Sequence, residues 1–402
     1  MDNNWSKKES PFLGLTGMGG GVGSLMFAGV AKTPFSLFAW GTNSWGQLGV
    51  NTAENYYSSP TQVGTDTDWA VVRAASQGYW SWFLKNDGTL WGSGRGANAV
   101  SGMGYNDGPE ISSPVQLPGT YKSLYASKST AAIKSDGSLW TWGDNQYGGL
   151  GHNNRTKYSS PRQVGTNTTW GSSDGDLTKE GASYHDMVVG KDSKILLKTN
   201  GTLWGVGRND SDMNLGLNDR ISRSSPTQIG TDTNWVQASG GERTAVAIKS
   251  DGTLWIWGHN NYGQIGAGGE APQSSPLQIG TETTWATADS QNSVTVAIKT
   301  DGTLWSWGYN GRGDLGHNNK VVYSSPKQVG TDTNWATVSA ADNVGATKTD
   351  GTAWTWGANQ WTGTGGQNDV VARSSPTQLG TGTKWQRLDI SASAAFGLQT
   401  VD

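Results

Sequence analysis

The chain contains no cysteine, and charged residues make up only 15% of it. Without cysteine there is neither a disulfide nor a thiolate ligand for a metal. The formal net charge is −3, and lysine and arginine are not clustered, so the basic face that binding to nucleic acid requires is missing. No run of 18 apolar residues occurs, so the sequence predicts no membrane-spanning helix.

Glycine and tryptophan are abundant instead, with 59 and 22 copies among 402 residues. Disordered chains are poor in aromatic residues, so this composition argues against disorder. Each buried indole removes roughly 150–250 Å² from water. A few tryptophans in each structural unit can therefore hold together a core that has little leucine and isoleucine. Such a compositional bias also indicates internal repetition.

Two independent sequence markers each occur seven times. The first is Ser-Ser-Pro, which ends at Pro60, Pro114, Pro161, Pro226, Pro276, Pro326 and Pro376. The second is an apolar–Trp–x–Trp–Gly run and its variants, which begins near residues 37, 90, 139, 203, 254, 304 and 353. Most steps are close to fifty residues. Repeats of this period predict seven supersecondary units that stack on one another.

One unit, Thr244–Trp285, shows how the repeat is built. The run Thr244–Lys249 is followed by Asp251-Gly252 and by Leu254–Trp257, and Asp-Gly between two such runs predicts a β-hairpin. In the second run both tryptophans point to one face and both aliphatic residues to the other. The bulky face is expected to pack on the smaller face of the neighbouring unit. No segment has a helical period, so the repeat is all-β.

The first repeat begins at Leu37 without the preceding strand and hairpin. Residues 391–400 have the sequence pattern of that missing strand. The C-terminal strand is therefore expected to complete the first unit, which closes the stack into a ring with no open terminal face. An open solenoid is the alternative. The predicted fold over residues 37–402 is an all-β, seven-bladed β-propeller whose first blade is closed by the C-terminal strand.

The run Trp40–Gly49 resembles the regulator-of-chromosome-condensation repeat family. Similar runs occur at Trp142–Gly151, Trp257–Gly266 and Trp307–Gly316. The resemblance covers residues 37–402 and includes the Asp-Gly hairpin and the period. It implies seven four-stranded blades with a shared closing blade. The eukaryotic founders of the family promote guanine-nucleotide exchange, and a related plant photoreceptor senses ultraviolet light through clustered tryptophans.

Neither activity transfers readily to this chain, because fold does not imply function. The family's usual Gly-x-x-His before the inner strand is replaced at residues 240–243, 290–293 and 340–343, which disfavours exchange activity. The tryptophans occupy the packing positions of the repeat, so a structural role is the better interpretation of them.

Residues 1–36 form a Gly-rich arm outside the repeat. Three interpretations are open: a signal peptide cleaved near Ala31, a phosphate-binding loop that lacks the usual spacing, or a tether that inserts into a neighbouring subunit. We favour the tether. The arm and the repeat are also similar to those of propeller proteins from bacteriophages and environmental bacteria. The expected anchoring residues are Trp5, Phe12, Leu13, Leu25, Met26 and Phe27.

No pattern in the sequence is typical of catalysis, a cofactor or a metal site. The four histidines, His152, His185, His259 and His317, are interpreted as solvated loop residues. Candidate binding residues lie where a repeat departs from the others, because insertions and irregular loops often form the binding face of repeat proteins. They are Trp45, Arg95, Tyr105, Asp174, Asp176, Tyr184, His185 and Trp361.

The sequence thus predicts a non-catalytic structural or interaction protein without a cofactor. The favoured hypothesis is a virion-associated propeller that is anchored to other virion proteins through residues 1–36 and presents its loops to a host protein or glycan. The alternative is a secreted or cell-surface bacterial propeller that binds protein or glycan. An enzyme or an exchange factor is the least favoured hypothesis.

Overall fold

The computed structural model describes residues 33–75, 79–96, 103–104, 110–172, 187–190, 192–210, 213–241, 243–291, 293–359 and 363–401. These residues form strands, turns and bends, and none of them is helical. They belong to a compact unit that begins at Thr33, and the first strand begins at Phe35. The predicted anchoring residues of the arm lie outside the described residues.

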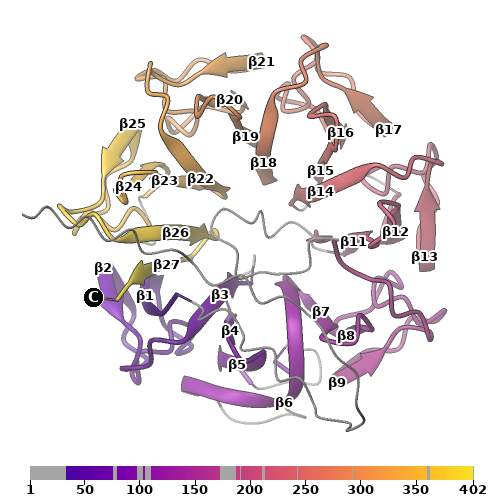
Figure 1. Cartoon of the computed structure of the whole chain (residues 1–402), viewed down its shortest axis with the longest axis horizontal. Coiled ribbons are helices and arrows are strands. Elements are labelled where there is room, and N and C mark those ends of the chain that lie inside the picture. The colour runs from indigo at the N-terminus through magenta and orange to yellow at the C-terminus, as the bar shows by residue number, and fades with distance from the viewer. Residues whose placement is uncertain are drawn as a thin grey trace, which may run out of the picture. The chain divides into compact units, whose positions relative to one another are not determined.

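The strands form four-stranded antiparallel blades around a common axis (Figure 1). Blade 1 consists of β2 (Tyr56–Gln62), β1 (Phe35–Thr42), β27 (Ala394–Thr400) and β26 (Trp385–Ile390). Blades 2 and 3 comprise β3 (Trp69–Ala74), β4 (Trp80–Lys85), β5 (Thr89–Gly94), β6 (Ile111–Ala126), β7 (Ser129–Lys134), β8 (Leu139–Gly143) and β9 (Tyr158–Gln163).

Blades 4 and 5 comprise β10 (Met187–Val189), β11 (Ser193–Leu197), β12 (Leu203–Gly207), β13 (Arg223–Ile229), β14 (Trp235–Gly240), β15 (Thr244–Lys249), β16 (Leu254–Gly258) and β17 (Gln273–Gln278). Blades 6 and 7 comprise β18 (Trp285–Gln291), β19 (Val294–Lys299), β20 (Leu304–Gly308), β21 (Tyr323–Gln328), β22 (Trp335–Ala340), β23 (Asn343–Lys348), β24 (Ala353–Gly357) and β25 (Arg373–Gln378).

The long strand β6 belongs to two blades. Its first part, from Ile111 to Thr120, pairs with β5, and its second part, from Tyr121 to Ala126, pairs with β7. Blades 2 and 3 therefore appear as one seven-stranded sheet. Dividing β6 at this point gives seven four-stranded blades, as the repeat predicts.

The predicted closure of the ring by the C-terminal strand is confirmed. β27 pairs with β1 from Phe35 opposite Thr400 to Gly41 opposite Ala394. β26 pairs with the other edge of β27, so the last two strands of the chain supply the inner half of blade 1 (Figure 1). The closed ring leaves no terminal blade with an open face.

The predicted packing of bulky faces on small faces is also confirmed. Trp255 and Trp257 of blade 5 lie in one core cluster with Ile195 and Leu197 of blade 4. Leu254 and Ile256, on the opposite face of the same strand, lie in the cluster that contains Trp307 of blade 6. The core is therefore a set of layers between blades, and each layer is completed only when the next blade covers it.

The Gly-rich loops are built around a buried asparagine. Asn260 Oδ1 accepts a hydrogen bond from the backbone N–H of Ile265 at 2.8 Å, and its Nδ2 donates to the carbonyls of Gly269 and Ala271 at 2.9 and 3.0 Å. One amide thus satisfies three backbone groups that the turn leaves unpaired. This explains the asparagine in the motif Trp-Gly-x-Asn, and the same bond to the backbone is made by Asn43, Asn145, Asn209, Asn310 and Asn359.

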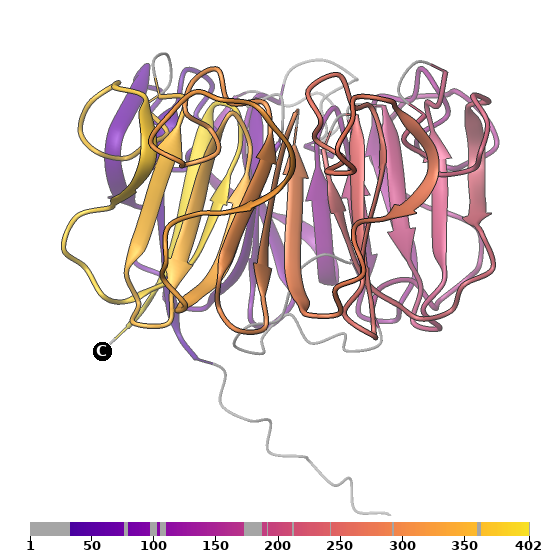
Figure 2. The same ribbon diagram turned by 90° about the horizontal axis from the view of Figure 1, so that it is seen from above.

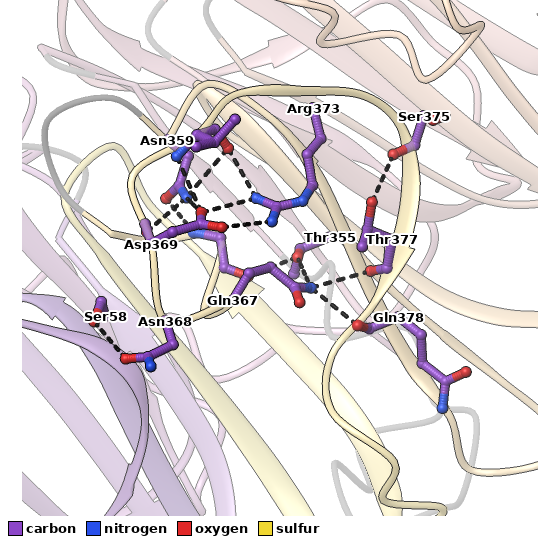
Figure 3. A network of polar contacts seen from close by, with 12 residues as sticks. Ser58, Thr355, Asn359, Gln367, Asn368, Asp369, Arg373, Ser375, Thr377 and Gln378 are labelled. Carbon is purple, nitrogen blue, oxygen red and sulfur yellow. Dashed lines mark hydrogen bonds and ion pairs between the residues drawn. The ribbon is translucent and has the colours of Figure 1, made fainter.

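The Ser-Ser-Pro marker forms the seam between blades. In the closing seam, Asn368 of blade 7 donates its backbone N–H to the carbonyl of Ser58 in blade 1 at 2.8 Å, and the Ser58 hydroxyl donates to Asn368 Oδ1 at 3.2 Å (Figure 3). Asn368 has a φ of 60°, a left-handed conformation that asparagine tolerates. The same backbone bond joins Asn318 to Ser374 and Gly268 to Ser324. Closure therefore reuses the contact that joins the other blades.

Candidate binding surface on the loop face

The two ends of the propeller carry different connections (Figure 2). The hairpin face, at the lower edge of Figure 2, contains the Asp-Gly turns, the start of each inner strand, and the residues Phe35 and Thr400 at the edge of blade 1. The loop face, at the upper edge, contains the Gly-rich loops between the third and fourth strands of each blade.

The hairpin face repeats one side-chain arrangement from blade to blade. In blade 5 the Lys249 ammonium lies 4.7 Å from the ring centre of Trp235 and 4.0 Å from that of Trp255, and 2.9 Å from a carboxylate oxygen of Asp232. Cation–π contacts and the ion pair hold the lysine stem over apolar surface. The other lysines between two aromatic rings are Lys85, Lys134, Lys198, Lys299 and Lys348.

The exceptions show which part of this arrangement is needed. Asn167 stands in blade 4 where blade 5 has Asp232, and desolvation by burial lowers the pKa of Lys198 there. In blade 1, Gln399 replaces the lysine and Phe38 packs edge-on against Trp385, with ring centres 5.6 Å apart. The aromatic layer thus persists without the ion pair, as expected if burial of the rings contributes most of the stabilisation.

The loop face differs from blade to blade. The Arg95 guanidinium lies 4.4 Å from the ring centre of Trp45 and 5.9 Å from that of Tyr79. Arg208 lies 4.7 Å from the ring centre of Tyr147. These contacts join blade 2 to blade 1 and blade 4 to blade 3.

Blades 5 and 6 make an aromatic pair at the equivalent place. The rings of Tyr262 and Tyr309 are 5.0 Å apart at an angle of 68°, an edge-to-face arrangement. Tyr262 is 42% exposed. We call the residues of these contacts the aromatic–arginine ring; they are Trp45, Tyr79, Arg95, Tyr147, Arg208, Tyr262 and Tyr309.

The repeat explains why these residues meet. Trp45 and Tyr262 each stand two residues after the buried asparagine of their loop, whereas Arg95 and Tyr309 each follow the glycine that ends the third strand of the next blade. The two positions are about fifty residues apart in sequence. The backbone fixes where the side chains meet, and the residue type at each position is left free to vary.

Two of the predicted candidate residues, Trp45 and Arg95, are brought into direct contact. The other candidates, Tyr105, Asp174, Asp176, Tyr184, His185 and Trp361, lie outside the described residues. Sequence reasoning missed the other five residues of the ring, which are Tyr79, Tyr147, Arg208, Tyr262 and Tyr309. For Arg208 and Tyr309 the signal was available, because both directly follow the Trp-x-Trp-Gly position.

A buried lysine lies below the loop face between blades 3 and 4. Lys194 is 1% exposed, and its Nζ donates to the Ser129 hydroxyl at 2.7 Å and to the Gly149 carbonyl at 2.8 Å. Desolvation by burial lowers the pKa of Lys194 to about 7, against the opposing attraction of Asp192 and Asp144. Gly149 stands where the other loops have a larger residue such as Gln264, so the ammonium group lies beside a position that has no side chain.

Asp314 is a second ionisable group in a buried loop position. It is 2% exposed, and burial raises its pKa to about 6. Its Oδ2 accepts a hydrogen bond from the Arg312 N–H at 3.1 Å, and Gln264 Oε1 accepts the equivalent bond from the Tyr262 N–H at 3.0 Å. A neutral side chain fills the same position in blade 5, so the carboxylate is not required by the fold.

The interpretation of the histidines as solvated loop residues was wrong for two of them. His152 and His317 are half-buried and stack edge-on against Tyr158 and Tyr323. Burial lowers the pKa of each imidazole to about 4. The loop folds back on its own blade, so the ring serves as packing; a sequence pattern could not show that.

Polar side chains near the propeller axis bond one inner strand to the next. Arg73 of β3 and Asp389 of β26 form an ion pair at 2.5 Å, and the Ser239 hydroxyl donates to Asp289 at 2.5 Å. Asp289 also accepts the Ala340 N–H at 2.9 Å. Burial raises the pKa of Asp289. Because these groups bond to one another, they are best explained as a structural ring.

Within the described residues no three histidine, aspartate or glutamate side chains are grouped in a way that could hold a metal ion. In the same part of the chain no helix is long and apolar enough to cross a membrane.

The family comparison decides the fold family. The model of the RCC1-like domain matches residues 36–399. The chain belongs to the RCC1-like domain family. The resemblance seen in the Trp-Gly-x-Asn repeats is thereby confirmed.

Several curated RCC1-like relatives match part of the chain. The ultraviolet-B receptor UVR8 of Arabidopsis thaliana is 26% identical over 59% of this chain and 52% of its own length. The mitochondrial RCC1 domain-containing protein RUG3 of the same plant is 28% identical over 58% and 52%. The human E3 ubiquitin-protein ligase HERC2 is 24% identical over 58% of this chain and 5% of its own length. The chain therefore spans at most about half of these relatives.

Solved RCC1-like structures have the same fold. Prp20p of Saccharomyces cerevisiae, studied for its binding to Gsp1p and histones, superimposes with a TM-score of 0.77 at 17% identity over 92% of both chains. Human WBSCR16 superimposes with a TM-score of 0.76 at 18% identity over 91% of this chain and 99% of its own. At this level of identity the likeness establishes the propeller fold alone.

Proposed function

We propose that this RCC1-like propeller is a non-catalytic binding module that contacts a protein partner through its loop face. One observation carries the proposal: the loop face presents the aromatic–arginine ring, whose members change from blade to blade. Tryptophan, tyrosine and arginine are the residues that most often dominate the binding energy of protein interfaces. An arrangement needed only for folding would repeat from blade to blade, as the lysine between two aromatic rings does in six of the seven blades.

The described ring residues have the exposure that a binding surface needs. Tyr262 is 42% exposed and Tyr79 is 39% exposed, whereas Trp45 and Arg95 are half-buried against each other. The contact with Trp45 holds the guanidinium in place before a partner arrives, which reduces the entropy lost on binding. Arginine held on an aromatic face retains donors for a carboxylate of the partner.

Partner capture before and after substitution tests the loop face. Crosslinking in the native source, followed by mass spectrometry, identifies the proteins bound to the full chain. The variant Arg95→Ala/Tyr262→Ala is expected to reduce capture of such a partner at least tenfold, the loss of two interface anchors. The matched control Thr231→Ala lies in an exposed turn of the hairpin face and is expected to leave capture unchanged. Equal capture by all three proteins would refute the proposal.

We further propose that the Gly-rich N-terminal arm anchors the propeller to another protein of a virion, a contact separate from that of the loop-face partner. The proposal rests on the sequence of that arm, in which a Gly-rich stretch is flanked by the apolar residues Trp5, Phe12, Leu13, Leu25, Met26 and Phe27. A Gly-rich chain with spaced apolar residues is suited to an extended docking segment. Secretion to a cell surface is the alternative, because the same segment has the order of charge and apolar residues of a signal peptide.

Removal of residues 1–32 separates these two locations. If the arm is a virion anchor, the shortened chain is expected to be lost from particles. Its unfolding temperature should be unchanged, which shows that the propeller still folds. Cleavage near Ala31 with export of the propeller would favour the secreted alternative. The substitution Phe27→Ser/Met26→Ser, which keeps the length of the arm, is the milder variant and is expected to weaken incorporation in the same direction.

A further inference from the structure

We propose that the interface between blades 3 and 4 is a pH-sensitive joint of the ring, which loosens when Lys194 gains a proton. Lys194 lies on β11 of blade 4, next to blade 3 around the axis (Figure 1), and is 1% exposed. Its Nζ donates to two groups of blade 3, the Ser129 hydroxyl at 2.7 Å and the Gly149 carbonyl at 2.8 Å. The proposal concerns how two blades hold together, so it does not depend on the partner of the loop face.

At five other interfaces the loop carbonyl of one blade accepts its bond from a side chain that does not titrate. In blade 5 the indole N–H of Trp257 donates to the Asn214 carbonyl of blade 4 at 2.8 Å. An indole N–H or a serine hydroxyl keeps its proton throughout the pH range in which proteins fold. The other four such bonds are Trp40 to Thr364, Ser93 to Gln47, Trp307 to Gln264 and Trp356 to Asp314.

Blade 4 has a lysine in this role because it lacks the tryptophan. Val206 stands where blade 5 has Trp257, and Lys194 lies directly opposite Val206 in the pairing of β11 with β12. Blade 5 has Ala245 opposite its tryptophan, so the large and the small residue have exchanged strands. The lysine stem thus reaches the loop carbonyl that an indole reaches elsewhere. A Cβ on Gly149 would lie 3.6 Å from Nζ, so the glycine leaves room for this group.

The two acceptors suit the neutral form of the lysine. A neutral amine has two N–H groups, whereas an ammonium group has three and a positive charge. Burial of a charge away from water is costly, and desolvation by burial lowers the pKa of Lys194 from 10.5 to about 7. In an open interface the side chain regains water and its ordinary pKa. Protonation therefore favours the open form of the interface.

The carboxylates near Lys194 only partly offset this effect. Asp192 and Asp144 attract the ammonium group and oppose the effect of burial on its pKa. The Asp192 carboxylate is shared with two other cations, since it lies 3.7 Å from the Lys128 ammonium and 3.8 Å from the Arg208 guanidinium. Its charge is therefore not held by Lys194 alone.

The remaining charged groups around the interface do not titrate in the same range. The Asp144 carboxylate lies 3.2 Å from the Lys157 ammonium. His152 comes from the same loop of blade 3 as Gly149. Burial, together with the charges of Arg162 and Lys194, lowers the pKa of the His152 imidazole to about 4. The imidazole is therefore neutral above pH 6, and Lys194 is the group that changes charge near pH 7.

Two contacts of the loop face cross the same interface. The Arg208 guanidinium of blade 4 lies on the ring of Tyr147 of blade 3, and the Lys128 ammonium of blade 3 faces Asp192 of blade 4. Loosening of the interface separates the partners of both contacts. The joint therefore alters one part of the aromatic–arginine ring when its protonation changes.

Hydrogen–deuterium exchange of the full chain between pH 6 and pH 10 tests the joint, after correction for the pH dependence of chemical exchange. Peptides that contain β7 and β11 report on it, and peptides that contain β15 and β19 report on the interface between blades 5 and 6. Opening between blades 3 and 4 is expected to become about tenfold more frequent for each unit of pH lost between about pH 10 and pH 7.5, and to level off below. An equal pH dependence at both interfaces would overturn the proposal.

Three variants assign the effect to Lys194. Lys194→Met keeps a long side chain without a titrating group and is expected to remove the pH dependence of opening. Lys194→Ala/Val206→Trp copies Ala245 and Trp257 of blade 5 and is expected to do the same. Lys320→Met makes the first substitution at an exposed loop position and is expected to behave like the unmodified chain.

The thermal unfolding temperature shows which variants fold. If one of the two Lys194 variants does not fold, the other decides. A folded Lys194 variant that still opens more often as the pH falls would refute the assignment, because the titrating group would then lie elsewhere. Failure of partner capture by the loop face leaves these exchange rates unaffected, so the two proposals fail separately.

Discussion

The hairpin face and the loop face of the propeller are built from the same repeat, yet they vary to different degrees. On the hairpin face, six of the seven blades place a lysine between two aromatic rings, and blade 1, which lacks the lysine, still keeps the aromatic layer. On the loop face the equivalent contact is arginine on tryptophan, arginine on tyrosine, or tyrosine on tyrosine.

The difference shows where stability constrains the sequence. One ring of each pair on the hairpin face, such as Trp235, is buried between blades, so its truncation opens a cavity. On the loop face the backbone of the Gly-rich loop is already held by its asparagine, as in the bonds of Asn260. Side chains that project from such a loop can change at little cost, and binding surfaces are commonly built in this way.

Truncation of one aromatic ring on each face should give the largest difference. Trp235→Ala on the hairpin face removes a ring that is 3% exposed and is expected to lower the free energy of unfolding by about 3–5 kcal/mol. Tyr262→Ala on the loop face, at 42% exposure, is expected to change it by at most about 0.5 kcal/mol. Urea unfolding of both variants measures this, and similar losses would remove the distinction between the faces.

The buried lysine below the loop face should appear in the pH dependence of stability. The pKa of Lys194 is about 7 in the folded chain and 10.5 as a free side chain. At pH values between about 7 and 10.5 the unfolded chain binds more protons at this lysine than the folded chain does. The free energy of unfolding therefore increases with pH in this range. Lys194→Met is expected to lack that rise. The check is unfolding in urea at pH 6, 8 and 10; parallel pH profiles of the two proteins would contradict it.

Asp314 should show the opposite sign. Its pKa is raised to about 6 from 3.8, so the folded chain binds the extra proton between these values and stability falls as pH rises through this window. Asp314→Gln, which copies Gln264 of blade 5, is expected to match the unmodified chain near pH 4 and to be the more stable protein at pH 7. Thermal unfolding at both pH values tests this, and an advantage that is equal at pH 4 and 7 would count against burial as its cause.

Loss of the guanidinium from the aromatic–arginine ring should have only a small effect on folding. Arg95→Ala removes a half-buried cation–π contact with Trp45 and is expected to lower the free energy of unfolding by about 0.5–1 kcal/mol. Arg95→Lys, which keeps the charge, serves as the control and should lose less. A loss as large as that of Trp235→Ala would mean that the ring is a structural element after all.

Most of the fold could be predicted from the sequence because the turns and strands of each blade are specified by residues that are close together in the chain. The turn at Asp251-Gly252, the strand Leu254–Gly258 and the Ser-Ser-Pro strand each follow from residues within one repeat. Closure was predictable for the same reason, since residues 391–400 supply a strand that the first repeat lacks. The candidate site was harder, because it depends on pairs about fifty residues apart. Trp45 and Arg95 were each identified, but their contact was not.

The sequence alone determined the number of blades, the strand that closes the ring and the alternation of bulky and small faces, because these depend on periodicity and on short turns. Only the tertiary structure decided how neighbouring blades compensate for each other. Lys194 occupies space beside Gly149, and Arg95 lies on Trp45. These contacts are made by side chains from different repeats across one interface, and no pattern within a single repeat predicts them.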